Sequence, residues 1–236
     1  SSLASNAIGR GGTLLVAAGG DGTLSEVVAA AAGTDCQVGL IPMGLGNDFA
    51  RTVGVPLELE AACEVLARGR ARAVDVGRAG SRVFINACGV GLDAEVAKTV
   101  ARAPSFVPGT AAYTISLFRV LAGFKGFGAE LELDSERVSV EAFLIAVANA
   151  RYYGGGMKIA PDADTSDGLL DICVVEAVDK LTFVRLFPLV FSGNHVRDRR
   201  VHIYRARRVR IHASPPQSVH IDGDPAGLTP FEAAIA

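Results

Sequence analysis

TLLVAAGGDGT, residues 13–23, decides the fold of the first part of the chain. A continuous apolar run that ends in glycines is typical of a buried parallel strand followed by a tight turn. Residues 24–32 then show a helical pattern, and residues 38–42 indicate the next short strand. A helix is also expected at residues 58–68, with its apolar side chains on one face. This alternation predicts a parallel sheet with right-handed crossovers.

The glycine loop after the first strand is a candidate phosphate-binding site. Glycines let the backbone come close to a phosphate, and the start of the next helix offers free N–H groups. Asp21 adds a carboxylate where a magnesium nucleotide needs an oxygen partner. The alternative is a capping box between Thr23 and Glu26, which requires no ligand. The candidate nucleotide-binding residues here are Gly19, Gly20, Asp21, Gly22, Thr23, Leu24, Ser25 and Glu26.

A second polar loop follows the next strand, in the segment IPMGLGNDFAR at residues 41–51. Asn47 and Asp48 favour caps and turns, so a helix starting near Phe49 explains them without a ligand. The functional interpretation places this loop beside the first one, at the carboxyl ends of adjacent strands, where open α/β sheets bind ligands. Gly44, Asn47 and Asp48 therefore join the candidate nucleotide site.

After residue 72 the sequence pattern changes from alternating strands and helices to mostly β-strands. Many short strands separated by Gly, Pro and Asp turns predict a β-sandwich, interrupted by helices near residues 111–121 and 181–189. We place an α/β domain at residues 1–72 and the β-domain at residues 73–224, and leave open that residues 225–236 return to the first domain. The strand candidates are residues 74–77, 82–88, 129–133, 138–148, 170–175, 201–204, 209–212 and 219–222.

Composition narrows the classes of function. Of the 236 residues 50% are hydrophobic and 20% are charged, which fits a globular protein and excludes a disordered one. A formal net charge of −2 gives no overall field for nucleic acid, so no nucleic-acid partner is expected. The four cysteines lie far apart without CxxC spacing, which argues against a zinc site and suits a reducing compartment.

Taken together, the two loops and several later segments resemble the diacylglycerol kinase catalytic domain family, which is also similar to sphingosine and ceramide kinases. The resemblance runs nearly end to end and implies a Rossmann-like nucleotide domain followed by a β-sandwich. It also implies ATP and Mg²⁺ as cofactors, and transfer of the γ-phosphoryl group to a lipid hydroxyl, with diacylglycerol the expected acceptor. The motifs are GGDGT (19–23), PMGLGNDFAR (42–51), NACGVGLDA (86–94), NARYYGGGM (149–157), DGLLD (167–171) and HIDGDP (220–225).

The catalytic carboxylates are expected near the end of the chain. The resemblance places the general base at Asp222, and Asp224 stands where the family usually has Glu. From the residues alone, Asp222 and Gly223 are better explained as a hairpin turn, since Asp-Gly is a strong hairpin signal.

A second acidic turn is a candidate metal site. The resemblance places a structural Mg²⁺ on Asp164, Asp167 and the carbonyl of Leu169. The alternative is an Asx-turn that satisfies its own backbone. Asp93 is a further acidic candidate, expected to point into the cleft between the domains.

Lipid and membrane contacts are expected from two regions. Residues 106–127 are rich in large apolar groups, which indicate either an acyl-chain groove between the domains or ordinary core. Seven arginines between Arg197 and Arg210 predict either a patch for anionic headgroups or the wet face of a strand. The expected partners are a lipid alcohol and, transiently, the anionic membrane surface. The expected location is cytoplasmic and peripheral at the inner membrane surface, and a homodimer is left open.

Two departures from the family pattern keep an alternative open. The family's first strand and glycine-bearing loop would precede Ser1, and Leu45 stands where the family usually has Thr. The alternatives to an active lipid kinase are a catalytically impaired protein that binds lipid or nucleotide on the kinase fold, and an NAD kinase-like enzyme.

Overall fold

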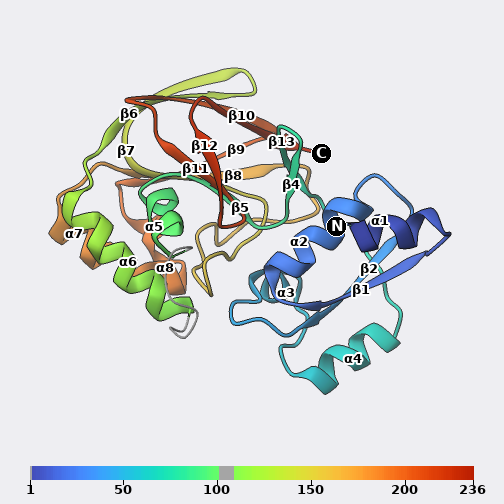
Figure 1. Cartoon of the computed structure of the whole chain (residues 1–236). Coiled ribbons are helices and arrows are strands. Elements are labelled where there is room, and N and C mark those ends of the chain that lie inside the picture. Colours follow the sequence, from blue (N-terminus) through green and yellow to red (C-terminus); the bar gives the residue numbers. More distant parts are fainter. Residues whose placement is uncertain (1, 101–108) are drawn as a thin grey trace.

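The computed structural model describes residues 2–100 and 109–236, with the backbone alone for residues 109–113. The first part of the chain, blue to cyan in Figure 1, is an α/β unit. Its strands β1 (Leu14–Gly19) and β2 (Gln37–Pro42) pair in parallel, as predicted. The helices of this unit are α1 (Ser2–Gly9), α2 (Asp21–Ala31), α3 (Asp48–Val53) and α4 (Leu59–Ala67).

Strand β1 is less buried than its apolar sequence predicts. Ala17 is buried, yet Leu14 and Val16 are 51% and 45% exposed. Helix α2 packs on β1 while α4 packs on β2. Within the described residues, the face of β1 that carries Leu14 and Val16 is therefore left mostly uncovered.

An extended segment links the two parts of the chain. Residues 70–76 form neither helix nor strand, so the strand expected at residues 74–77 is wrong. Asp75 N–H donates to Thr165 O at 2.6 Å instead of joining a strand ladder. The expected boundary at residue 72 lies within this segment.

The second part is a curled antiparallel sheet, which in the described residues has 11 strands. The predicted sandwich character is confirmed. The last strands of the chain belong to this sheet, because β12 forms one end of it beside β11 and β13 lies between β10 and β3. Residues 225–236 therefore stay in this domain. The strands are β3 (Gly77–Ala79), β4 (Arg82–Phe84), β5 (Ala87–Gly91), β6 (Phe127–Leu133), β7 (Glu136–Ala148), β8 (Leu170–Glu176), β9 (Val201–Ala206), β10 (Arg208–Ser214), β11 (Ser218–Ile221), β12 (Asp224–Leu228) and β13 (Phe231–Ile235).

Helices cover one side of this sheet (Figure 1). Two of the helical segments were predicted, but α5 was missed because its sequence lies among strand-like stretches. Strand β7 explains the arrangement: Ile145 and Val147 enter the core enclosed by the curled sheet, while Leu144 and Ala146 pack under the helices. The helices are α5 (Leu92–Val100), α6 (Gly109–Gly123), α7 (Lys180–Leu186), α8 (Leu189–Ser192) and the 3₁₀ turn Asn194–Arg197.

The described part of the apolar region at residues 106–127, which is residues 109–127, belongs to the second domain. Phe106 and the side chain of Tyr113 lie outside the described residues. Helix α6 packs against α5, and its buried Leu117 and Leu121 join the core under the helices. The described part of this region therefore does not line a groove between the domains, as one of the two interpretations expected.

Candidate active site

The loops that follow β1 and β2 touch backbone to backbone. A Cβ atom built on Gly44 would lie 2.5 Å from Gly20 Cα, so this contact requires glycine. The parallel pairing of the strands brings Gly19 opposite Pro42 and delivers both loops to one edge. The two candidate loops are adjacent, as the strand order predicts.

Asp21 connects the two loops. Its two carboxylate oxygens accept hydrogen bonds from Asp48 N and Phe49 N, each at 3.0 Å. These are the first backbone N–H groups of α3, which a carboxylate stabilises. Asn86 Nδ2 also reaches Asp21 Oδ1, at 3.4 Å. Asp21 thus serves as a cap for α3, and its expected role as an oxygen partner for a magnesium nucleotide stays a prediction.

Helix α2 begins earlier than the sequence indicates. It starts at Asp21 with Gly20 in the capping position and no side-chain cap, so Thr23 lies inside the helix and the alternative of a capping box between Thr23 and Glu26 is wrong. The first turn of an α-helix has backbone N–H groups without intrahelical partners. Around Gly22 there is open space, since a Cβ built there meets nothing within 4 Å.

Asn47 closes the second loop on itself. Its backbone is left-handed, with φ of 51°, a conformation that asparagine tolerates better than most residues. Its side chain accepts from Gly44 N at 2.9 Å and donates to Gly44 O at 2.7 Å. The loop shape is therefore set before any ligand binds.

Asp48 ties the first domain to the second. Its carboxylate accepts from Gly155 N at 2.8 Å and from Gly156 N at 2.7 Å. Residues 154–156 are glycines with φ between 63° and 101°, a left-handed run that other residues would strain. Burial is the main reason why the pKa of Asp48 is raised to about 6, against hydrogen bonds from both glycines that lower it.

The raised pKa of Asp48 predicts a pH-dependent stability. The folded state holds this proton more tightly than the unfolded state, so folded protein loses stability as pH rises from about 4 to about 6. A shift of about two units corresponds to ~3 kcal/mol. We expect Asp48→Asn to remove this part of the pH dependence. Urea unfolding at pH 4.5 and pH 7 measures it, and an unchanged pH dependence in the variant would contradict the expectation.

Asp222 lies in a two-residue hairpin turn between β11 and β12. Both turn residues are left-handed, with φ of 48° at Asp222 and 90° at Gly223, so the predicted hairpin turn is confirmed. The carboxylate accepts from the backbone N–H groups of Ile85, Asn86 and Ala87 at 2.9–3.1 Å.

The same carboxylate meets helix α2. Ser25 Oγ donates to Asp222 Oδ2 at 3.1 Å, across 197 residues of sequence. Burial raises the pKa of Asp222, partly offset by the backbone and Ser25 hydrogen bonds. The expected base thus sits beside the helix that follows the glycine loop.

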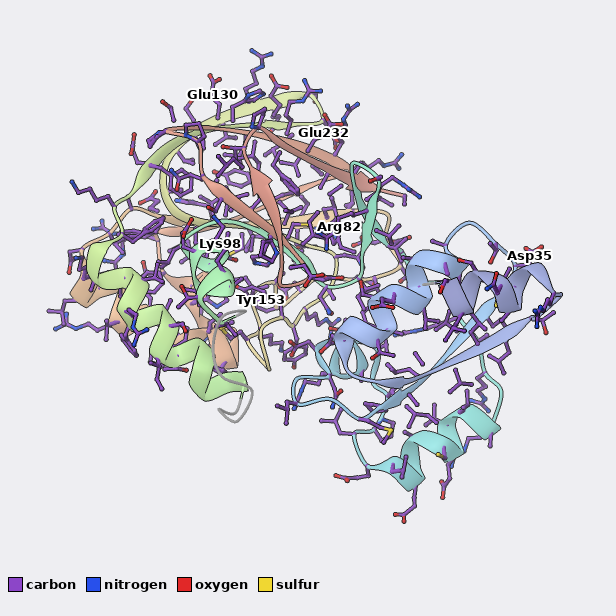
Figure 2. All side chains as sticks on the ribbon, in the orientation of Figure 1. Asp35, Arg82, Lys98, Glu130, Tyr153 and Glu232 are labelled. Atoms are coloured by element: carbon purple, nitrogen blue, oxygen red, sulfur yellow. The ribbon has the colours of Figure 1, made fainter. Side chains whose placement is uncertain are left out.

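Asp224 has a different setting. Its side chain is 80% exposed and pairs with Arg82 at 3.2 Å. Arg82 lies on β4, next to the β11–β12 hairpin (Figure 2). The catalytic role expected for Asp224 stays a prediction.

Comparison with known proteins identifies the family. Residues 1–79 match the family model described as the diacylglycerol kinase catalytic domain, and residues 86–236 match the YegS C-terminal NAD kinase beta sandwich-like domain. A diacylglycerol kinase of Bacillus subtilis (strain 168) is 32% identical over 222 residues, covering 93% of this chain and 73% of that protein. A diacylglycerol kinase of Mycobacterium tuberculosis (strain ATCC 25618 / H37Rv) is 34% identical over 237 residues, covering 98% and 76%.

The chain belongs to the diacylglycerol kinase family. It is a kinase of this lipid-kinase family. The fold agrees: the crystal structure of a diacylglycerol kinase from Bacillus anthracis str. Sterne superposes with a TM-score of 0.73 at 23% identity, over 98% of this chain and 77% of that one. An NAD kinase from Archaeoglobus fulgidus in complex with ATP has a TM-score of 0.51 at 12% identity, over 95% and 74%, which shows a shared fold only.

The metal site expected from the diacylglycerol kinase family has the geometry of turns. Asp164 Oδ1 accepts from Ser166 N at 3.0 Å, and Asp167 Oδ1 accepts from Leu169 N at 3.0 Å. Asp167 Oδ2 pairs with Arg205, and the described residues contain no cluster of three His, Cys, Asp or Glu side chains fit for a metal. A cation would have to displace this guanidinium, so the present arrangement does not fit Mg²⁺.

Most of the predicted basic patch is neutralised by partners. Arg200 pairs with Asp198, Arg205 with Asp167, and Arg208 and Arg210 with Glu232. Strand β10 carries Arg208 and Arg210 on its exposed face. These arginines fit the solvent-exposed face of a strand better than a binding site for anionic lipid headgroups.

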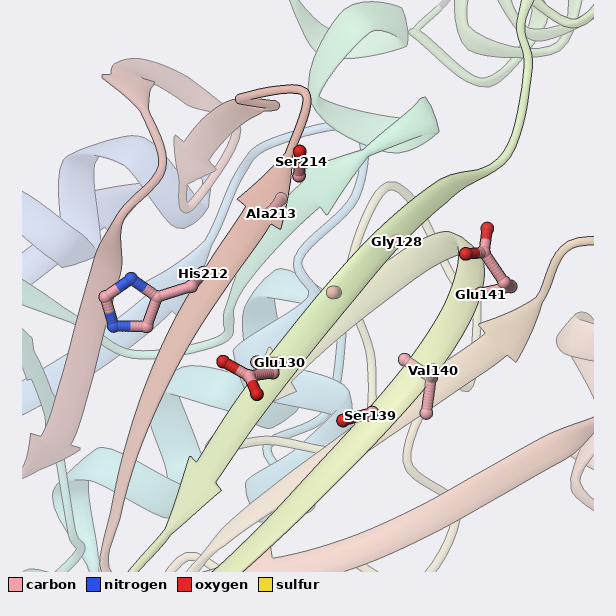
Figure 3. Close-up of a pocket in the computed structure, with 9 residues that line it drawn as sticks. Gly128, Glu130, Ser139, Val140, Glu141, His212, Ala213 and Ser214 are labelled. Atoms are coloured by element: carbon pink, nitrogen blue, oxygen red, sulfur yellow. The ribbon is translucent and has the colours of Figure 1, made fainter.

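An apolar pocket lies under helices α6, α7 and α8. Tyr153 belongs to its wall and also touches Asp93, with its hydroxyl 3.4 Å from Asp93 Oδ2. A larger hollow of about 470 Å³ lies on the outer face of β6, β7 and β10, away from the two loops (Figure 3). The apolar pocket is lined by Leu117, Leu144, Tyr153, Met157, Ile159, Val175, Phe183, Leu186, Phe187, Val190, His195 and Val201.

Several site residues were missed or misplaced by sequence reasoning. Asp93 is only 1% exposed and pairs with His220, so it does not point into an open cleft. Asn86, Gly155 and Gly156 contribute through contacts with distant residues. The triple glycine at residues 154–156 was a usable signal, because three successive glycines suggest a backbone that receives another group.

Proposed function

We propose that this chain transfers the γ-phosphoryl group of ATP to a lipid hydroxyl, and that diacylglycerol is its preferred acceptor. The observation that carries the proposal is the hydrogen bond from Ser25 to Asp222. It places a candidate base from the second domain beside the helix that follows the glycine loop. A base beside a phosphate-binding backbone is what phosphoryl transfer to an alcohol requires.

The nucleotide phosphates would lie at the start of α2. The glycine loop leaves open space at Gly22, and the helix start offers unpaired N–H groups and a positive dipole end. ATP would supply the phosphoryl group, with Mg²⁺ to neutralise its charge. The match of residues 1–79 to the diacylglycerol kinase catalytic domain supports a nucleotide role for this domain.

Asp222 would accept the proton of the lipid hydroxyl. Its raised pKa makes it a better proton acceptor than an ordinary carboxylate. Four hydrogen bonds fix its position. The base is therefore held in place before the lipid arrives.

The acyl chains would enter the apolar pocket under α6–α8. We expect Val190→Phe, which adds bulk at the pocket wall, to raise the KM for the lipid about tenfold while the KM for ATP stays unchanged. Val184→Phe is the matched control, because Val184 lies on the neighbouring helix α7 and is 37% exposed. Equal effects of both substitutions on the lipid KM would contradict this placement.

Membrane contact would use the exposed apolar side chains of the same helices. Ile115 and Phe118 on α6, with Leu181 on α7, are 45–60% exposed around the pocket. Among the described residues, no helix has the length and apolar character that crossing a bilayer requires. On the basis of the exposed Ile115, Phe118 and Leu181 we propose peripheral contact with an anionic membrane surface, in phospholipid metabolism. Phe118→Ser is expected to weaken co-sedimentation with vesicles of anionic phospholipid, and Leu59→Ser on α4 of the first domain, at a side chain that is 54% exposed, is not.

A lipid panel assay tests the proposed function directly. Purified protein is given ATP labelled at the γ-position, Mg²⁺ and vesicles that contain diacylglycerol, a sphingoid base or another lipid alcohol. We expect labelled phosphatidic acid. ATP binding without any labelled lipid would favour the catalytically impaired alternative instead.

A further inference from the structure

A buried side-chain cluster lies directly behind the turn that carries Asp222. His220 is 3% exposed and Asp93 is 1% exposed. His220 Nδ1 accepts from Gly223 N at 3.2 Å, and His220 Nε2 lies 3.1 Å from Asp93 Oδ2. Because Nδ1 accepts, the ring proton is on Nε2 and is donated to Asp93. One imidazole therefore connects the turn to helix α5.

The cluster also reaches the apolar pocket. Tyr153 forms part of the pocket wall, and its ring is stacked on His220 with centroids 6.3 Å apart. Its hydroxyl is 3.4 Å from the Asp93 oxygen that His220 contacts. Tyr153 is thus shared between the pocket and the cluster.

The cluster is a costly arrangement for packing alone. Asp93 Oδ1 has no hydrogen-bond partner among the described residues, and a buried carboxylate without full pairing destabilises a fold. A Cβ on Gly89 would lie 2.1 Å from Asp93 Oδ2 and 2.3 Å from His220 Nε2, so the contact also requires glycine at this position.

We propose that Asp93, His220 and Tyr153 form a buried link that positions the Asp222–Gly223 turn and joins it to the wall of the apolar pocket. His220 and Asp93 are positioning residues, which act on the reaction through Asp222. The catalytic part of this proposal rests on the proposed function. The structural part, that His220 fixes the turn, does not.

Two substitutions separate the two bonds of His220. Asparagine places its Oδ1 where His220 has Nδ1, so His220→Asn keeps an acceptor for Gly223 N–H and loses the reach to Asp93. Glutamine places its Nε2 where His220 has Nε2, so His220→Gln keeps the bond to Asp93 and loses the one to Gly223. Both variants are polar, so a difference between them reports on which bond matters.

Kinetics and amide exchange give the test. We expect both variants to lower kcat at an unchanged KM for ATP: His220→Gln at least tenfold, because it releases the turn itself, and His220→Asn by about threefold to tenfold, because it releases only the support from Asp93. NMR hydrogen exchange at the Gly223 amide should accelerate in His220→Gln alone. Melting temperatures confirm that each variant is folded at the assay temperature.

The outcomes distinguish the two proposals. If wild-type protein phosphorylates no lipid, the proposed function fails, but the exchange comparison still decides whether His220 fixes the turn. If His220→Gln keeps the wild-type kcat and wild-type exchange at Gly223, the link is overturned. Tyr153→Phe tests the pocket end: it should lower the kcat for a long-chain diacylglycerol more than for a short-chain one, and equal effects would remove Tyr153 from the link.

Discussion

Asp222→Asn is expected to lower kcat for lipid phosphorylation by about 10²- to 10⁴-fold, the usual contribution of a general base. The amide cannot accept the hydroxyl proton. It also turns an N–H donor toward the backbone N–H groups that the carboxylate now accepts from, at Ile85 or at Asn86 and Ala87. One lost hydrogen bond of this kind destabilises the fold by about 1–3 kcal/mol. Labelled-phosphate assays below the melting temperature of the variant measure the catalytic part.

Asp224→Asn is the matched control. It makes the same chemical change two residues away, on a side chain that is 80% exposed and paired with Arg82. The ion pair with Arg82 alone predicts a change in kcat of less than about threefold, since exposed ion pairs contribute little. A loss as large as that of Asp222→Asn would show that Asp224 takes part in the reaction, as the family pattern suggests. Full activity of Asp222→Asn would exclude Asp222 as the base.

The sequence predicted the local elements of the first domain because their signals are local. Strand β1 is an apolar run that ends in glycine. Asn47 and Asp48, which favour helix caps, predict the helix that begins near Phe49. The burial of β1 was overestimated, since Leu14 and Val16 depend on which helix covers which face. Helix α5 was missed for a similar reason: Leu92 and Val96 are buried by tertiary packing, and their spacing alone did not mark a helix among strands.

The structure gives several candidate site residues contacts that the sequence did not predict. Asp21 and Asp48 were both expected at the nucleotide. In the structure, the carboxylate of each accepts hydrogen bonds from backbone N–H groups of another segment. Such long-range partners leave no periodic trace in a sequence. The same holds for His220, which reads as an ordinary strand residue until the fold brings Asp93 beside it across 127 residues. Family motifs indicate which residues are candidates for the site. Deciding which of them is a base, a helix cap or a positioning residue requires the three-dimensional structure.

Gly44→Ala should have the second largest effect, through the contact of the two loops. Its Cβ would lie 2.5 Å from Gly20 Cα and 2.9 Å from Asn47 Oδ1. The first of these atoms is backbone and cannot rotate away, so the loops must separate. We expect about 1–3 kcal/mol of destabilisation from overpacking. We also expect ATP affinity to fall about a hundredfold, because the nucleotide site would be misplaced by about 1 Å.

Gly22→Ala separates crowding of the loops from blocking of the ligand. A Cβ on Gly22 meets no atom within 4 Å, and alanine favours helix α2 over glycine by about 1 kcal/mol, so this variant should melt higher than wild type. If phosphates lie at the start of α2, the added methyl occupies their space, and ATP binding by calorimetry should weaken although the fold is more stable. Unchanged ATP affinity in Gly22→Ala would move the phosphates away from this helix, whatever Gly44→Ala shows. A stability gain with an affinity loss would be the signature of a glycine kept open for a ligand, since at a glycine without a ligand role alanine would raise stability and leave ATP affinity unchanged.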